Sequence, residues 1–115
     1  MTPLALALIL LVALLHLYFL VLEMFLWTRP IGLRTFRNTP EKAELMRVLA
    51  GNQGLYNGFL AAGLLGAVAT MQRDVATFFL ACVAIAGLYG AATVSRRILY
   101  VQAVPALAAI AAVWL

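Results

Sequence analysis

The chain has 115 residues, of which 66% are hydrophobic and 10% are charged, and its formal net charge is +4. A soluble domain carries about 25% charged residues, so this composition excludes a protein that faces water on all sides. The mean hydropathy of +1.05 indicates a single integral membrane domain over residues 1–115. The basic residues lie in short connectors, which argues against nucleic acid as a partner and for contacts with anionic lipid headgroups.

Four segments reach or approach the roughly 20 apolar residues that a helix needs to cross a bilayer. We expect helices at about 3–27, 40–70, 75–95 and 98–115. The first has no basic residue before its apolar run and continues past the usual length of a signal peptide, so we interpret it as a retained helix. The predicted fold class is all-α, a bundle of four transmembrane helices.

The predicted start of the second helix lies in the sequence "NTPEK". Thr39 can cap the helix, Pro40 suits its first position, and Glu41 suits the positive end of the helix dipole. The preceding stretch "WTRPIGLRTF" mixes basic and apolar residues and is expected along the headgroup region. A solvated basic connector and a dedicated ligand site are both open interpretations of it.

The distribution of basic residues predicts the orientation. The first connector region holds Arg29, Arg34, Arg37, Lys42 and Arg47. The third connector holds Arg96 and Arg97, whereas Arg73 in the second is offset by Asp74. By the positive-inside rule the first and third connectors are cytoplasmic, so both termini are expected on the non-cytoplasmic side.

Small residues recur along the second predicted helix. Gly54, Gly58, Ala62 and Gly66 are spaced by four, a pattern that lets another helix approach closely. Four short helices bury little surface alone, so we also expect a homo-oligomer.

Polar residues fall in the cytoplasmic half of the predicted bundle. Counting about 1.5 Å per helical residue puts Glu23 roughly 6 Å below the cytoplasmic interface and Asn57 roughly 15 Å below it. The outer half carries almost no polar side chain, which predicts one polar cluster open toward the cytoplasm. Its expected members are His16, Glu23, Asn52, Gln53, Tyr56, Asn57 and Tyr89.

Glu23 is the only acid inside the predicted hydrocarbon region, and such a residue is a functional candidate by default. It could stay neutral, or be ionised beside Arg47, Arg96 or Arg97. Alternatively, it could bind amides of the second helix and only fix helix packing.

His16 is the only histidine and cannot form a metal site alone. It could hydrogen-bond Asn57 or a backbone carbonyl, or it could handle protons. Cys82 is the only cysteine, which excludes an intrachain disulfide and a multi-cysteine metal site. We therefore expect no metal and no cofactor.

Two stretches, "LEMFLWTRPIGLRTF" and "LAGNQGLYNGFLAAGLL", resemble the signature of a family of small bacterial membrane proteins catalogued as domain of unknown function 1304. The resemblance implies a four-helix, multi-pass protein of the bacterial cytoplasmic (inner) membrane and brings no established activity. A weaker likeness is to the small four-helix membrane proteins of eicosanoid and glutathione metabolism. Arg47, Asn52 and Asn57 match part of their polar site, but the second helix has no acid at that level.

Three classes of function follow. The first is a protein that binds or transports a small polar or amphipathic ligand at Glu23 and the neighbouring amides. The second is a membrane enzyme acting on a lipophilic substrate, with Glu23 or His16 as acid or base. The absence of a nucleophile–base pair or metal cluster in the sequence argues against it. The third is a structural or assembly protein whose polar residues only fix packing.

Overall fold

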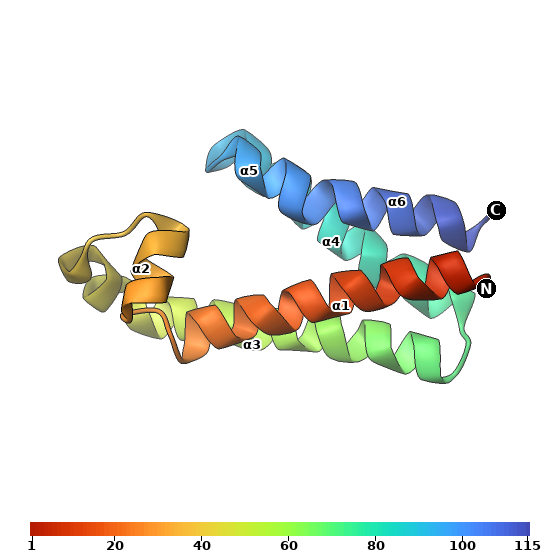
Figure 1. The fold of residues 1–115 in the computed structure, drawn as a ribbon, viewed down its shortest axis with the longest axis horizontal. Helices are drawn as coiled ribbons and strands as arrows, with labels where there is room; N and C mark the ends of the chain where they lie inside the picture. Colours follow the sequence, from red (N-terminus) through yellow and green to blue (C-terminus); the bar gives the residue numbers. More distant parts are fainter. The chain divides into compact units, whose positions relative to one another are not determined.

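The computed structural model describes residues 1–115, and every regular element in it is helical (Figure 1). The elements are α1 (Pro3–Met24), α2 (Pro30–Phe36), α3 (Pro40–Ala69), α4 (Arg73–Thr93), α5 (Arg96–Ile98), the π-helical segment η1 (Leu99–Ala103) and α6 (Val104–Val113). The predicted all-α class is confirmed. The first helix ends three residues earlier than predicted, and the last begins two residues earlier.

Three helices are long and apolar enough to cross a membrane, not four. They are α1, α4 and the continuous helical run Arg96–Val113. Helix α3 has 30 residues and is therefore long enough. It falls short in composition, because charged residues occupy its first two turns and the amides and glycines of "NQGLYNG" lower the hydropathy of its middle.

The chain divides into two compact units, and each is described by itself. Unit 1 contains Met1–Leu14 and Leu60–Leu115, and unit 2 contains Leu15–Phe59. Both α1 and α3 contribute one end to each unit. The predicted single domain stays a prediction.

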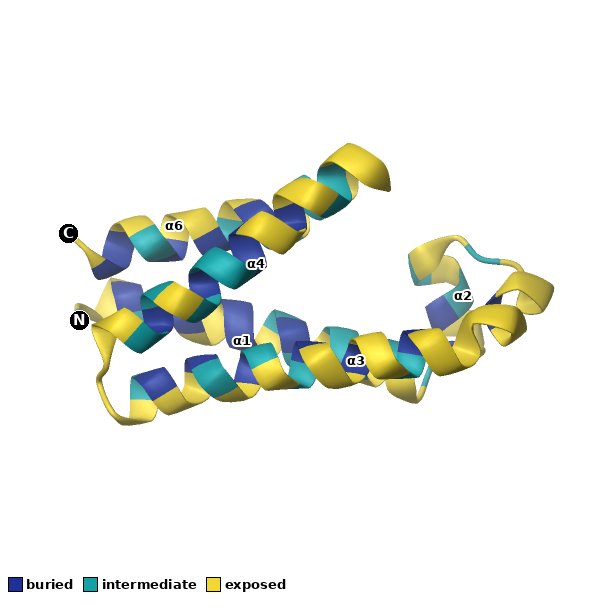
Figure 2. Ribbon diagram, turned by 180° about the vertical axis from the view of Figure 1, so that it is seen from behind, coloured by how far each residue is buried: buried dark blue, intermediate teal, exposed yellow.

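Unit 1 has a core built from small and β-branched side chains. Figure 2 shows buried positions recurring along α4 and α6, which contact each other. On α6 the buried alanines recur every third residue, at Ala106, Ala109 and Ala112. On α4 they face a row that includes Leu80 and Val83. Small side chains allow close helix packing in a membrane, where van der Waals contact drives association.

Two glycines of α4 allow the helical run that follows it to approach closely. A Cβ atom at Gly87 would lie 2.7 Å from the backbone nitrogen of Ala103, and one at Gly90 would lie 2.9 Å from Ile98. Neither position tolerates a side chain without movement. Sequence reasoning missed this contact and selected the glycines of α3 instead.

The π-helical segment has a local cause. Pro105 has no backbone N–H and cannot donate to the carbonyl of Val101, four residues earlier. The N–H of Val104 donates to the carbonyl of Leu99, five residues earlier. The helix thus continues through Pro105 by widening one turn before it.

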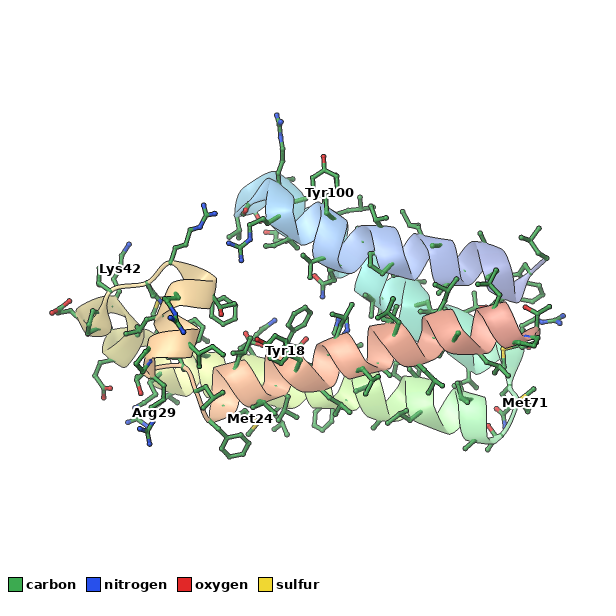
Figure 3. All side chains as sticks on the ribbon, viewed as in Figure 1. Tyr18, Met24, Arg29, Lys42, Met71 and Tyr100 are labelled. Carbon is green, nitrogen blue, oxygen red and sulfur yellow. The ribbon has the colours of Figure 1, made fainter.

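The turn between α3 and α4 strains one residue. Met71 adopts φ = 52°, in the left-handed region, at the position marked in Figure 3. The N–H of Gln72 donates to the carbonyl of Ala67, and the N–H of Met71 donates to Val68. This is the hydrogen-bond pattern of a helix end that normally favours glycine. On the α4 side of the turn, the Arg73 guanidinium lies 5.2 Å from the ring centre of Trp114.

Unit 2 is organised around the short helix α2 and the first turns of α3. The predicted cap of α3 is present: the N–H of Lys42 donates to the Thr39 hydroxyl at 3.2 Å, and the helix begins at Pro40. Gly32 of α2 is buried against the preceding turn, where an added Cβ would lie 2.0 Å from the carbonyl oxygen of Leu26. That atom belongs to the backbone and cannot rotate away.

Candidate functional site

Glu23 and Asn57 are hydrogen-bonded in unit 2. The Asn57 amide nitrogen Nδ2 donates to Glu23 Oε1 at 2.5 Å, which joins the last turn of α1 to the middle of α3. Asn57 is only 6% exposed. This is the contact expected if Glu23 binds an amide of the second helix. Counting residues had put Asn57 roughly 9 Å deeper than Glu23. The two are level because α1 ends at Met24, beside Gly54, so the turns of α3 before Gly54 extend past the end of α1.

Two glycines of α3 bring the helices close enough for this bond. A Cβ at Gly54 would lie 2.6 Å from Met24 Cγ and 3.2 Å from Glu23 Cβ. One at Gly58 would lie 2.7 Å from Leu20 Cδ1. The missing side chains therefore position Glu23 directly against α3.

The predicted strip of small residues does not continue as expected. Ala62 and Gly66, which belong to unit 1, are exposed, and nothing lies within 4 Å of a Cβ built at Gly66. Four residues advance about 400° around a helix, so each step of four rotates the position by about 40°. The buried positions in this part of α3 instead follow steps of four, three and three, at Asn57, Ala61, Leu64 and Ala67.

A pocket of about 170 Å³ opens beside Glu23. Its lining comes entirely from unit 2: Glu23, Trp27, Met46, Leu49, Ala50 and Gln53. Glu23 is the one acidic side chain in this lining. The only other polar groups are the amide of Gln53 and the indole N–H of Trp27. The carboxyl group that bonds Asn57 therefore also borders an accessible, largely apolar space.

Trp27 holds the far side of this pocket in place. Its Nε1 donates to the carbonyl oxygen of Ala43 at 2.9 Å, and its ring lies 4.9 Å from that of Phe36. Ala43 is fully buried beneath it. The indole thus connects the end of α1 to α2 and to the first turn of α3. Sequence analysis did not select Trp27 for this role, although its place four residues after Glu23 was a usable signal.

The other predicted members of the cluster are not part of this lining. Asn52 and Tyr56 share an exposed face of α3, where the Tyr56 ring packs edge-on against Phe59 at 5.7 Å. His16 is fully buried, with its ring 5.2 Å from that of Phe19. Tyr89 is exposed and belongs to unit 1. Of the predicted set, Gln53 lines the pocket with Glu23, and Asn57 is hydrogen-bonded to Glu23.

Arg47, one of the three predicted counter-ions, has another partner. Arg47 forms an ion pair with Glu44, 3.3 Å away and one turn earlier on α3, so the structure does not place it on Glu23. The pairing is favoured because residues three apart are neighbours on a helix surface. Arg96 and Arg97 belong to unit 1, and their role as counter-ions to Glu23 stays a prediction. No group of three or more His, Cys, Asp or Glu side chains is arranged to hold a metal ion.

These features define a small helical protein with helices long and apolar enough to span a membrane and a pocket lined by one carboxyl group. Residues 10–114 match the family described as "Protein of unknown function (DUF1304)", and the chain belongs to that family. It is also 34% identical over 106 residues to the uncharacterized protein YpaA of Lactococcus lactis subsp. lactis (strain IL1403), with 89% of each chain covered. No solved structure matches the chain.

Proposed function

We propose that this protein is a four-span membrane protein that binds an amphipathic ligand at the Glu23 pocket. The observation that carries the proposal is the location of Glu23. It lies in the last turn of a membrane-spanning helix and lines a pocket whose other walls are mostly apolar. A carboxyl group inside a membrane segment is expensive and marks a functional site by default. Its single hydrogen bond to Asn57 leaves the side that borders the pocket able to meet a ligand.

The proposal includes α3 as a fourth membrane span. At about 1.5 Å per residue its 30 residues extend about 45 Å, more than the roughly 30 Å of a hydrocarbon core. From Val48 to Ala69 it carries no charged residue. Four spans place both termini on the non-cytoplasmic side and the pocket near the cytoplasmic headgroups. In a bacterium the membrane is then the cytoplasmic (inner) one.

Two partners belong to the same proposal. Arg29, Arg34 and Arg37 are exposed around α2 and suit anionic headgroups, so the protein extracted from a mixed bilayer should retain phosphatidylglycerol in preference to phosphatidylcholine. The exposed amide of Asn52 suits a second copy of the chain, because side-chain amides hydrogen-bond across membrane helices. Native mass spectrometry of the protein in lipid discs tests this, and a monomer only would contradict it.

Extraction of the protein with its surrounding lipid tests the ligand site. The chain is purified in polymer-bounded native discs, and co-purified small molecules are identified by mass spectrometry. The variants are Glu23→Gln, which keeps an oxygen that can accept from Asn57, and Leu49→Phe, which enlarges an exposed side chain that lines the pocket. We expect at least one amphiphile to be enriched with the unmodified protein and depleted in both variants. Identical profiles for all three proteins would contradict a ligand site.

A purely structural role is the second candidate, and the Glu23–Asn57 hydrogen bond favours it. Under that alternative, substitutions at Glu23 change stability or oligomeric state and leave every co-purified molecule unchanged. The same extraction therefore separates the two functions.

A further inference from the structure

The size of the Glu23 pocket limits what can enter it. Its volume of about 170 Å³ is smaller than the roughly 300–1,000 Å³ of pockets that enclose a drug-sized ligand. A headgroup fits, and the remainder of an amphipathic molecule must lie outside among the exposed apolar side chains. Met46 and Leu49, both exposed and both part of the lining, provide such a path.

The charge of the lining is one-sided. Glu23 is the only side chain among the six that can carry a charge near neutral pH. Its hydrogen-bond partner Asn57 is neutral, and the basic residue nearest along α3, Arg47, is paired with Glu44. An ionised carboxylate in an apolar site requires a compensating positive charge. A bound cation would provide one.

The remaining lining also suits a cation of a particular kind. The ring of an indole attracts ammonium groups, and Trp27 is fixed in orientation by its bond to Ala43. Methionine and leucine side chains pack well against methyl or methylene groups, but they provide no oxygen ligand for a small metal ion. The Gln53 side chain adds a carbonyl oxygen that can accept from an N–H.

We propose that the Glu23 pocket binds the cationic headgroup of an amphipathic amine or quaternary ammonium compound. Glu23 is the counter-ion, Trp27 is the aromatic side of the site, and the hydrocarbon part of the ligand stays in the bilayer. The proposal rests on the proposed function, because it names the ligand class of the same pocket.

Fluorescence of Trp27 tests the charge of the ligand. The chain has two tryptophans, so Trp114→Phe leaves Trp27 as the sole indole reporter. This protein, in micelles of the non-ionic detergent dodecyl maltoside, is titrated with three probes that share one tail: decyltrimethylammonium, decyl sulfate and decanol. The comparison among probes needs no change at Glu23. The Glu23→Gln and Leu49→Phe variants are then made in the same Trp114→Phe background.

We expect saturable binding of decyltrimethylammonium with a Kd at least about tenfold below those of decyl sulfate and decanol. Glu23→Gln should weaken binding of the ammonium probe about tenfold or more and leave decanol unchanged. If decanol or decyl sulfate binds as tightly as the ammonium probe, the cation specificity is overturned. If Leu49→Phe also abolishes that binding, the pocket is still a ligand site, and the proposed function stands. If no probe binds saturably, both the specificity and the proposed function are overturned.

Discussion

At the scale of single residues, the Glu23–Asn57 hydrogen bond is the most consequential contact in unit 2. Asn57→Leu should lower the free energy of unfolding by about 1–3 kcal/mol, because a half-buried carboxyl group loses its only hydrogen-bond donor. Thermal unfolding in detergent, followed by circular dichroism, measures the change. Asn52→Leu is the matched control, since Asn52 is an exposed amide of the same helix. Equal losses in the two variants would show that the hydrogen bond is not the cause.

Met71 offers the opposite test, a substitution that should stabilise the fold. Its φ of 52° costs an L-residue about 1–2 kcal/mol, and glycine carries no such penalty. Met71→Gly should therefore raise the free energy of unfolding by up to about 1 kcal/mol. Met71→Ala removes the same side chain but keeps the penalty, so it should give no gain. A gain from alanine as large as that from glycine would refute the conformational explanation.

At the scale of elements, close helix packing depends on where a glycine sits rather than on how many there are. Gly54→Leu should force the end of α1 away from α3 and destabilise the protein by about 1–3 kcal/mol, since Met24 and Glu23 occupy the space. It should also abolish any ligand binding at the pocket. Gly66→Leu is the control, because nothing lies near that position. Unfolding curves of both variants give the comparison, and comparable destabilisation would contradict the packing argument.

The helices and their approximate bounds were largely predictable from the sequence. The side-chain contacts between the helices were not. The helix starts at Pro3 and Pro40 follow from proline and capping signals that act within one turn. The proximity of Glu23 to the amides followed from counting depth, although the level of Asn57 was misjudged. The Trp27–Ala43 bond was missed because it depends on the turn after α1, where helical periodicity no longer applies. The Gly87–Ala103 contact was missed because it depends on helix rotation, which repeats of four residues misrepresent by about 40° per step.

At the scale of the whole molecule, the proposed fourth span requires α3 to cross the bilayer. Thr28 lies in the connector between α1 and α2, and Gln72 lies three residues after the end of α3. Both are exposed, so they report on opposite sides of the membrane only if α3 crosses it. Single cysteines are introduced as Thr28→Cys and Gln72→Cys in a Cys82→Ala background and treated with a membrane-impermeant maleimide. In spheroplasts, whose cytoplasmic membrane is intact, we expect the maleimide to label position 72 only. Position 28 should react after the membrane is permeabilised. Labelling of both positions under the same condition would rule out the fourth span.

The widened turn before Pro105 sets the rotation of the preceding helical turn, Arg96–Ile98, relative to α6. One residue corresponds to about 100° around a helix, so a single extra residue within Leu99–Ala103 rotates the preceding turn relative to α6 by that amount. Arg96 and Arg97 lie in that preceding turn. The direction in which this basic pair points is therefore set by an imino acid eight residues further on. Deleting one residue from Leu99–Ala103 would rotate Arg96 and Arg97 about the helix axis, and so redirect two positive charges without changing either side chain.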